Sequence, residues 1–245
     1  MSRQNIFDDP YFFSSYQELR SGKNFNELLE QPAMRALLPD IRGKKVLDIG
    51  CGSGINCLEF SSQARRVLGI DISTKMLMSA MKENSAPNIE YRLLDMEKLD
   101  EIDETFDLIY SSLAFHYAVD FPRLIAQCFS HLNRGGILLF SQEHPITTCS
   151  VNTESRYVKD EEGNVFFKMA DYQAEGERHI RWFVDDVIHQ HRKLETIINT
   201  LTAAGFTIQS CTEPCPDRKA IRQLPRLANE LIKPSFIIFK AVKGD

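Results

Sequence analysis

Short apolar stretches alternate with amphipathic stretches through the middle of this 245-residue chain, and this rhythm predicts an α/β protein with a mostly parallel sheet and helices on both faces. Three glycines at alternate positions follow the first apolar stretch, residues 46–49, which predicts a strand, a tight turn and a helix. Polar residues stand at the ends of several predicted strands, where open parallel sheets bind ligands. We expect one domain, because 43% hydrophobic residues over this length suffice for a sizeable core.

The charge balance and the cysteine spacing limit the classes of function. The chain has 29 lysine and arginine residues and 34 aspartates and glutamates, a net charge of −5, and no block of basic residues stands out. A nucleic-acid partner is therefore not expected. The six cysteines contain no Cys-x-x-Cys pair, so we expect free thiols in the cytoplasm, without a disulfide framework or a metal site. No apolar run reaches the roughly 20 residues of a membrane helix, and the first residues do not resemble a signal peptide, so no membrane partner is expected either.

Residues 1–40 are expected to form an N-terminal helical cap. Aromatic side chains crowd residues 7–20, and leucine and methionine recur on one side of residues 26–38, so both stretches predict helices ahead of the sheet. The cap can simply pack on the sheet, or it can be a lid whose Tyr16, Arg20 or Asn24 touches a ligand. The pattern allows both interpretations.

Residues 41–145 are expected to form the ligand-binding core of the sheet. Ser73 can cap the helix that follows it, because a serine hydroxyl accepts from the first N–H groups of a helix. The predicted strands end in polar side chains, which would meet at one edge of the sheet. The predicted strands are residues 46–49, 65–71, 88–94, 106–110 and 137–141, the helices are residues 55–60, 74–83 and 121–132, and the strand-end side chains are Asp48, Asp71, Asp95, Ser111 and Glu143.

The alternation breaks after Pro145. Residues 146–188 are more polar and contain two short strand patterns, so we expect a β-rich insertion that returns over the strand ends as a lid. Residues 189–245 would complete the sheet with a helix and two antiparallel strands. The expected elements are strands at 165–167 and 180–183, a helix at 189–204, and strands at 206–211 and 235–242. Aromatic and arginine side chains of the insertion either wall a small pocket or pack as a solvated hairpin: Tyr157, Tyr172, Arg178, Arg181 and Trp182.

The glycine turn is suited to a nucleotide, because glycine permits close approach of the backbone and a helix start offers unpaired N–H groups. A dinucleotide site would show G-x-G-x-x-G, whereas Gly50, Gly52 and Gly54 give G-x-G-x-G. Asp71 follows at the distance at which a carboxylate takes ribose hydroxyls in either kind of site. Asp48 would repel a pyrophosphate but suits a ligand with an ammonium and a sulfonium group. A nicotinamide-dependent oxidoreductase remains an alternative.

These residues resemble a known family. Val46-Leu47-Asp48-Ile49-Gly50-Cys51-Gly52-Ser53-Gly54 closely resembles the first motif of class I S-adenosylmethionine-dependent methyltransferases of the small-molecule type. The resemblance covers about residues 40–145 and implies a Rossmann-like, seven-stranded sheet with the last strand antiparallel, S-adenosyl-L-methionine as cofactor and S-adenosyl-L-homocysteine as product. The further motifs that carry it follow in order: Gly69-Ile70-Asp71-Ile72-Ser73, Leu94-Asp95-Met96, Phe106-Asp107-Leu108-Ile109-Tyr110-Ser111-Ser112 and Leu132-Asn133-Arg134-Gly135-Gly136.

The resemblance also implies a role for each matching residue. The turn would pass beneath the methionine part of the cofactor, with Asp48 reaching its amino group, and Asp71 would hold the ribose hydroxyls. Ile72 and Met76 would flank the adenine, and Asp95 would accept from the adenine amino group. With the cap included, the expected cofactor-binding residues are Tyr16, Asp48, Gly50, Cys51, Gly52, Asp71, Ile72, Met76, Asp95, Met96 and Ser111.

Methyl transfer is an in-line displacement, in which alignment alone can supply roughly 7–11 kcal/mol, and a base is needed only when the nucleophile must lose a proton. His116 and His144 follow strands at the binding edge, where they can orient or deprotonate a substrate or serve as structural histidines. The strand end at Ser111 lacks the Asp/Asn-Pro-Pro-Tyr pattern of nucleic-acid amino-methyltransferases, so we expect a small-molecule acceptor and a monomer or homodimer. The other alternative is a non-catalytic regulatory protein that binds S-adenosylmethionine.

Overall fold

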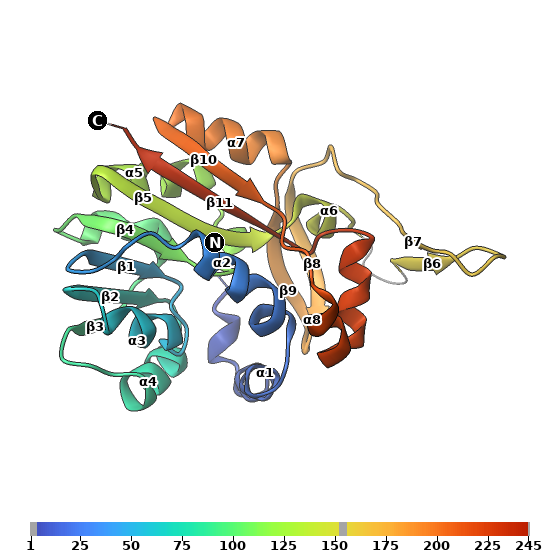
Figure 1. Cartoon of the computed structure of the whole chain (residues 1–245), viewed down its shortest axis with the longest axis horizontal. Helices are drawn as coiled ribbons and strands as arrows, with labels where there is room; N and C mark the ends of the chain where they lie inside the picture. Colours follow the sequence, from blue (N-terminus) through green and yellow to red (C-terminus); the bar gives the residue numbers. More distant parts are fainter. Residues whose placement is uncertain (1–3, 152–155, 245) are drawn as a thin grey trace.

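A seven-stranded sheet forms the centre of the computed structural model, which describes residues 4–151 and 156–244. The strand order is β10-β11-β5-β4-β1-β2-β3 (Figure 1). β11 runs antiparallel to both of its neighbours, and the remaining neighbours pair in parallel. The predicted fold class is therefore confirmed, including the antiparallel last strand. The strands are β1 (Lys45–Ile49), β2 (Arg66–Asp71), β3 (Ile89–Leu93), β4 (Phe106–Ser111), β5 (Leu132–Glu143), β10 (Phe206–Thr212) and β11 (Phe236–Lys243).

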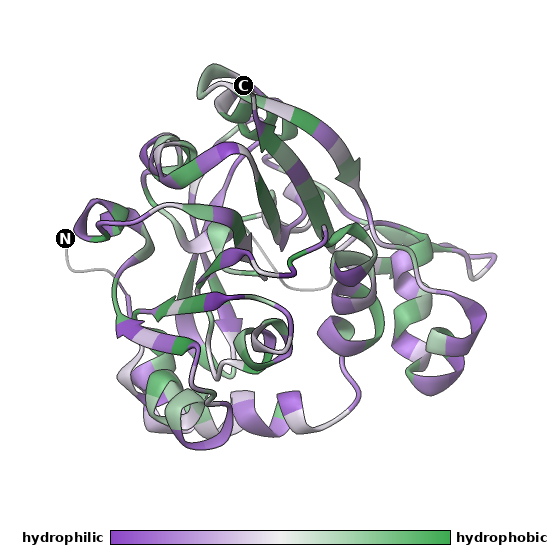
Figure 2. Cartoon of the chain, turned by 60° about the vertical axis from the view of Figure 1, so that its left-hand side comes forward, coloured by the Kyte–Doolittle hydropathy of each residue, from purple (hydrophilic) through white to green (hydrophobic). Residues whose placement is uncertain are grey.

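Helices cover both faces of the sheet because successive side chains of each strand point to opposite faces. In β1, Leu47 and Ile49 join the core under α5 and α7, whereas Val46 joins the core under α2, α3 and α4. Figure 2 shows hydrophobic residues along the strands of the sheet. The helices are α1 (Pro10–Ser21), α2 (Gln31–Leu37), α3 (Ile55–Ser61), α4 (Thr74–Glu83), α5 (Phe121–His131), α6 (Pro145–Thr148), α7 (Leu194–Ala203) and α8 (Arg218–Gln223), with short helical turns η1 (Ile6–Asp8), η2 (Asn26–Glu30), η3 (Met96–Glu101), η4 (Phe115–Tyr117) and η5 (Pro225–Leu231). None of the helices in the described part of the chain has the length and apolar character needed to cross a membrane.

The structure differs most from the sequence prediction at the helix expected over residues 189–204, which is wrong in its first part. Residues Val184–His191 instead form strand β9, which pairs antiparallel with β8 (Gly176–Trp182), and α7 begins only at Leu194. The strand buries Val187, His189 and His191 at alternate positions, and Gln190 between the two histidines is buried as well. A smaller difference lies in the cap, where a π-helical turn, η2, precedes α2. The insertion also contains a short hairpin of β6 (Tyr157–Lys159) and β7 (Val165–Phe167).

The N-terminal cap and the insertion meet beyond the carboxyl ends of the parallel strands, on the side to which the β5 arrowhead points in Figure 1. Phe12 and Tyr16 of α1 pack edge-on against Trp182, with ring centroids 5.2 and 6.0 Å apart. Ahead of α1, Asn5 donates to the carbonyl of Ile72 at 3.0 Å, directly after β2. The two peripheral segments therefore enclose the edge at which the strand-end acids lie.

Candidate active site

The glycine turn between β1 and α3 depends on three residues in the left-handed region, with φ of 70° at Gly50, 53° at Gly52 and 78° at Gly54. A Cβ at Gly50 would lie 2.5 Å from Cβ of Ala114, and one at Gly54 would lie 2.2 Å from Oη of Tyr91. Gly52 differs, because a Cβ there would meet no heavy atom of the described residues within 4 Å. The outer two glycines thus permit close packing, and the middle one faces open space.

Asp71 is held in place by the turn itself. Its Oδ2 accepts from the backbone N–H of Gly52 at 2.8 Å, and its Oδ1 accepts from the N–H of Ser73 at 2.8 Å. Burial outweighs these hydrogen bonds and raises the pKa of the carboxyl. Each oxygen keeps a further lone pair, so the group can accept from two neighbouring hydroxyls without losing its own supports.

Asp48 lies beneath the turn and is 1% exposed. Its Oδ2 accepts a hydrogen bond from Sγ of Cys57 at 3.3 Å. Burial, reinforced by the charges of Asp71 and Glu30, raises the pKa of Asp48 to about 7, against a lowering by the Cys57 hydrogen bond. A cation placed beside this carboxyl would favour its ionised form.

The next two strands place the other expected residues along the same edge. Asp95 follows β3 and caps η3, accepting from the N–H of Glu97 at 2.9 Å. Met96 packs against the core, and Met76 on α4 is buried. Ile72 is half-buried directly after Asp71. These residues lie along the carboxyl edge of the sheet from β2 to β3, beyond the glycine turn of β1.

Two of the residues expected to contact the cofactor have side chains that are buried within the protein. Ser111 at the end of β4 is fully buried and donates to the carbonyl of Ile49 at 2.8 Å, which ties β4 to β1. The thiol of Cys51 is buried, and burial raises its pKa to about 11. Any contact that these two residues make with a ligand would therefore use their backbone.

The cap brings Tyr16 and Arg20 of α1 toward the same edge. Nη1 of Arg20 is buried and has no hydrogen-bond partner among the described residues. Glu30 is fully buried nearby, where Oε1 accepts from Ser112 at 2.9 Å and from Ser141 at 2.5 Å. Glu30 thus fastens the cap to the ends of β4 and β5, while one nitrogen of the Arg20 guanidinium is left for another acceptor.

The two histidines expected from the sequence differ in what their ring nitrogens do. Nδ1 of His144 accepts from the N–H of Ile146 at 3.0 Å, and Nε2 bonds to Oε1 of Glu213 at 2.9 Å, so the side chain caps α6 and neither nitrogen is left for a substrate. His116, in η4 beyond β4, is buried, and burial lowers its pKa to about 3, so the ring is neutral near pH 7. His144 therefore has a structural position. Nδ1 of His116 accepts from the N–H of Glu143 at 3.4 Å, and its role in the site stays a prediction.

A further histidine, which the sequence reading missed, lies beside His116. Nδ1 of His189 on β9 is 2.7 Å from Oε2 of Glu143, at the end of β5. The rings of His116 and His189 are 5.0 Å apart, and Tyr117 stands edge-on to His189 at 4.9 Å. The alternation of Val187, His189 and His191 was the signal that these residues form a strand with His189 facing inward.

With this geometry in place, comparison with known proteins identifies the family. A family model described as a methyltransferase domain matches residues 47–140. A solved structure of an S-adenosylmethionine-dependent methyltransferase from Mesorhizobium loti is 37% identical and covers 87% of this chain and 97% of its own, with a TM-score of 0.80. The chain belongs to the S-adenosylmethionine-dependent methyltransferases. S-adenosyl-L-methionine is therefore the cofactor of this methyltransferase, and the comparisons support an enzyme of this class.

The names of related proteins differ in whether they state a methyl acceptor. An uncharacterized protein of Haemophilus influenzae is 40% identical over 86% of both chains. A trans-aconitate 2-methyltransferase of Deinococcus radiodurans is 34% identical over 46% of this chain and 44% of its own. A ubiquinone biosynthesis O-methyltransferase of Sinorhizobium medicae is 29% identical over 70% of this chain and 63% of its own. The relative that matches over 86% of both chains thus has a name that states no acceptor.

Two arginines of the insertion, Arg178 and Arg181, bond to other groups of the protein. Arg178 is buried, and its guanidinium donates to the carbonyls of Cys149 and Ala174, so it ties the insertion together and is not an anion anchor. Arg181 is exposed and pairs with Asp185 at 3.3 Å. The hydroxyl of Tyr172 accepts from the N–H of Leu194 at 3.1 Å and so supports the start of α7. Of the expected wall residues, Trp182 is the one that packs directly against the cap.

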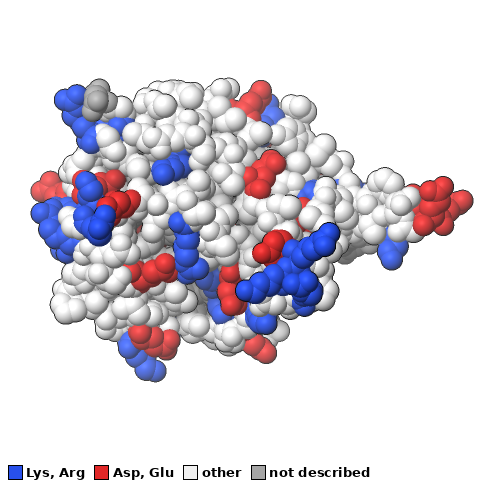
Figure 3. Space-filling model, in the orientation of Figure 1, with Lys and Arg blue, Asp and Glu red and all other residues white. Residues whose placement is uncertain are grey.

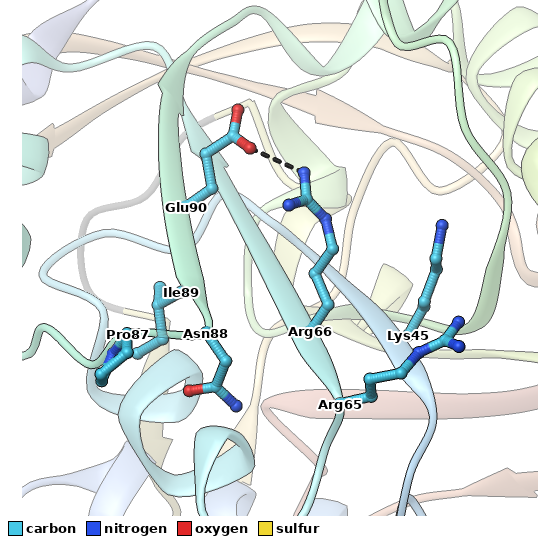
Figure 4. A pocket seen from close by; sticks show the side chains of 7 residues that line it. All are labelled: Lys45, Arg65, Arg66, Pro87, Asn88, Ile89 and Glu90. Carbon is cyan, nitrogen blue, oxygen red and sulfur yellow. Dashed lines mark hydrogen bonds and ion pairs between the residues drawn. The ribbon is translucent and has the colours of Figure 1, made fainter.

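The methyltransferase also has a hollow at the opposite edge of the sheet, near the amino ends of β1, β2 and β3 (Figure 4). Arg66 points across it to Glu90 at 2.6 Å and also pairs with Glu104 at 2.9 Å, so its charge is compensated within the protein. This hollow lies away from the carboxyl ends of the strands, where the acids and the glycine turn meet, and it is not the active site.

Proposed function

We propose that the protein transfers a methyl group from S-adenosylmethionine to a small-molecule acceptor by in-line displacement. The observation that carries the proposal is the open space at Gly52 beside the fixed carboxylate of Asp71, at the edge enclosed by the cap and the insertion. The named relatives methylate trans-aconitate or serve ubiquinone biosynthesis, which supports a small acceptor. Acidic and basic side chains are interspersed over the face shown in Figure 3, which supports the same choice over nucleic acid.

In this proposal the chain's own residues position the cofactor along the edge. Asp71 accepts from the ribose hydroxyls, Asp48 takes the ammonium group, and Arg20 takes the carboxylate of the methionine part. Gly52 lets the backbone approach the ligand closely. When bound, the cofactor supplies a methyl group on a sulfonium, and alignment of that group with the nucleophile is the main contribution of the protein.

Because Nη1 of Arg20 has no partner among the described residues, we predict that Arg20→Ala weakens the binding of one ligand and not of another. We expect the variant to bind S-adenosylhomocysteine at least tenfold more weakly, because a charge-assisted contact to the carboxylate is lost. Methylthioadenosine, which lacks the amino-acid part, should bind the variant as it binds the wild type. Isothermal titration calorimetry with both ligands checks this. An equal loss for both ligands would mean that Arg20 acts only through the packing of the cap.

The raised pKa of Asp48 predicts a pH dependence. Below about pH 7 the carboxyl carries a proton that must leave before the group can pair with the ammonium, so affinity for S-adenosylhomocysteine should fall as the pH is lowered from 8 to 6. In the free protein the same raised pKa makes Asp48 favour folding most below the unfolded value of about 3.9 and progressively less up to about 7. Asp71, whose pKa is also raised, contributes in the same direction. The Asp48→Asn variant should flatten the calorimetric profile, and a profile unchanged by the substitution would remove Asp48 from the site.

The proposed function is tested by label transfer. Purified protein incubated with S-adenosylmethionine carrying a tritiated methyl group should label material below 1 kDa in a deproteinised metabolite extract. If S-adenosylhomocysteine binds in calorimetry but no small molecule is labelled, the acceptor is not a small molecule. Label in protein or nucleic acid would mean that the acceptor is a macromolecule.

A further inference from the structure

We propose that His189 and Glu143 form a proton-accepting dyad for the methyl acceptor, and that this acceptor presents a hydroxyl group. The inference rests on the proposed function and adds to it a catalytic residue, His189, and a positioning residue, Glu143. Both lie at the carboxyl edge, over β4 and β5, next to the glycine turn of β1 in the strand order. The expected cofactor contacts extend the other way, along β2 and β3.

The hydrogen bonds of His189 define which ring nitrogen is left for a substrate. Nδ1 is 2.7 Å from the Glu143 carboxylate, which can only accept once it is ionised, so Nδ1 carries the proton. Although burial raises it, the hydrogen bond from His189 and the positive charge of Arg156 hold the pKa of Glu143 below its usual range. When the imidazole ring is neutral, its other nitrogen, Nε2, therefore carries no hydrogen. That nitrogen is buried, has no partner among the described residues, and belongs to a side chain that is 3% exposed.

A buried acceptor without a donor is costly in a finished fold, so the bare Nε2 indicates a ligand that supplies an N–H or O–H. A carboxylate orienting an imidazole whose far nitrogen takes a proton is the arrangement by which enzymes activate hydroxyl nucleophiles. Here the carboxylate comes from the end of β5 and the imidazole from β9, which lies outside the seven-stranded sheet.

The charges around the dyad select among possible acceptors. Arg156 and Lys233 are the basic side chains whose charges act on Glu143, and they disfavour an ammonium acceptor beside it. A carboxylate acceptor would need no base, because it is already ionised at neutral pH. A hydroxyl acceptor fits both conditions. It donates to Nε2 in the ground state and loses its proton to that nitrogen as the new bond forms.

The step balances without any further reactant. The acceptor oxygen forms a bond to the methyl carbon while the carbon–sulfur bond of the sulfonium breaks, and the electron pair of that bond stays on sulfur. The hydroxyl proton passes to Nε2 of His189, and the imidazolium that results is stabilised by Glu143. Product release returns this proton to water.

The same side chains are also candidates for binding a metal ion, because ligand atoms of His116, Glu143 and His189 lie within 4.8 Å of one another. A metal-bound imidazole normally donates its other ring N–H to a carboxylate, carbonyl or water. With Nδ1 on a metal, Nε2 of His189 would need such an acceptor, and none lies within reach among the described residues. His116 likewise has its Nδ1 beside a donor, the N–H of Glu143 at 3.4 Å. A metal site that uses Nδ1 of His189 together with Glu143 as a ligand is therefore disfavoured. A metal on Nε2 would leave Nδ1–H on Glu143, and the chelator test below distinguishes it from proton transfer.

The first test measures the tautomer directly. Protein labelled with ¹⁵N-histidine and saturated with S-adenosylhomocysteine should show, in long-range proton–nitrogen spectra near pH 8, a His189 ring with hydrogen on Nδ1 and a bare Nε2, assigned by loss of the signals in His189→Gln. In Glu143→Gln this preference should be lost, because the amide can also donate. Hydrogen on Nε2 in the wild type, or a doubly protonated ring at pH 8, would overturn the dyad.

The second test uses the labelled metabolite extract. Label should enter products that survive alkali and pass a cation exchanger, as methyl ethers do, whereas methyl esters would release volatile methanol and amines would be retained. His189→Gln should lower the transfer rate at least 100-fold, since general-base catalysis contributes about 10²–10⁴-fold, with S-adenosylhomocysteine affinity within twofold of the wild type. His191→Gln is the matched control. It lies on the same strand and is also buried, but its ring nitrogens already bond to Thr148 and to the Tyr172 carbonyl, so the variant should lose thermal stability and keep its rate.

Each outcome decides between the proposals. Labelled esters or amines, an unchanged rate in His189→Gln, or transfer that stops with a chelator and returns with Mn²⁺ or Zn²⁺ would overturn the inference while leaving methyl transfer intact. If the wild type binds S-adenosylhomocysteine but labels nothing in the extract, the small-molecule proposal fails instead, and the tautomer measurement alone decides on the dyad.

Discussion

Alanine in place of Gly52 should weaken binding of S-adenosylhomocysteine at least tenfold. The added methyl group would enter the space at the turn in which no heavy atom of the described residues lies within 4 Å, so it would meet the ligand and not the protein. The substitution also strains the backbone, because φ is 53° and a left-handed residue with a Cβ costs about 1–2 kcal/mol. Isothermal titration calorimetry gives the affinity, and thermal unfolding gives the strain.

Gly135 offers a matched control for this substitution. It has φ of 71° and equally open surroundings, but it lies in β5 near the amino edge of the sheet, on the side away from the glycine turn. Gly135→Ala should therefore lower the Tm about as much as Gly52→Ala and leave the affinity unchanged. If both variants bound S-adenosylhomocysteine as tightly as the wild type, the open space at Gly52 would not be part of the cofactor site.

The arrangement of the expected cofactor-binding residues could be predicted from the sequence because these residues are local to strand ends. Asp48 and Asp71 lie in the last two residues of β1 and β2, Gly52 follows β1 directly in the turn, and the carboxyl ends of parallel strands meet at one edge of the sheet. The structure brings Asp71 within 2.8 Å of the Gly52 N–H, a contact across 19 residues that follows from the parallel pairing of β1 and β2.

The acceptor half could not be predicted in the same way. His189 reaches Glu143 because β8 and β9 form a hairpin that folds back over the sheet, and the register of that hairpin is set by pairing outside the shared core. The sequence at 189–204 contains leucine and isoleucine at helical spacing, and this pattern concealed the end of β9. Likewise, nothing local shows that His144 has both nitrogens engaged, since one partner, Glu213, lies 69 residues away.

Replacing Asp71 by alanine should give the other large effect. We expect affinity for S-adenosylhomocysteine to fall roughly 10- to 150-fold, because each hydrogen bond to a charged group contributes about 1.5–3 kcal/mol. Methylthioadenosine should lose affinity by a similar factor, since it retains the ribose that Asp71 would hold. This separates Asp71 from Arg20 and Asp48, whose substitution should spare methylthioadenosine. Calorimetry with the two ligands makes the comparison.

Asp107 provides the control that distinguishes ligand binding from loop support. Asp71 also orders the turn, so its loss could weaken binding indirectly. Asp107 has the same supporting role at the opposite edge, where it accepts from the N–H of Lys45 and from Asn133, both at 2.9 Å. If Asp107→Ala loses as much thermal stability as Asp71→Ala while keeping its affinity, the loss at Asp71 reflects the ligand. An Asp71→Ala variant with unchanged affinity would instead leave Asp71 as a brace for the glycine turn, and the ribose would have to be held elsewhere along the edge.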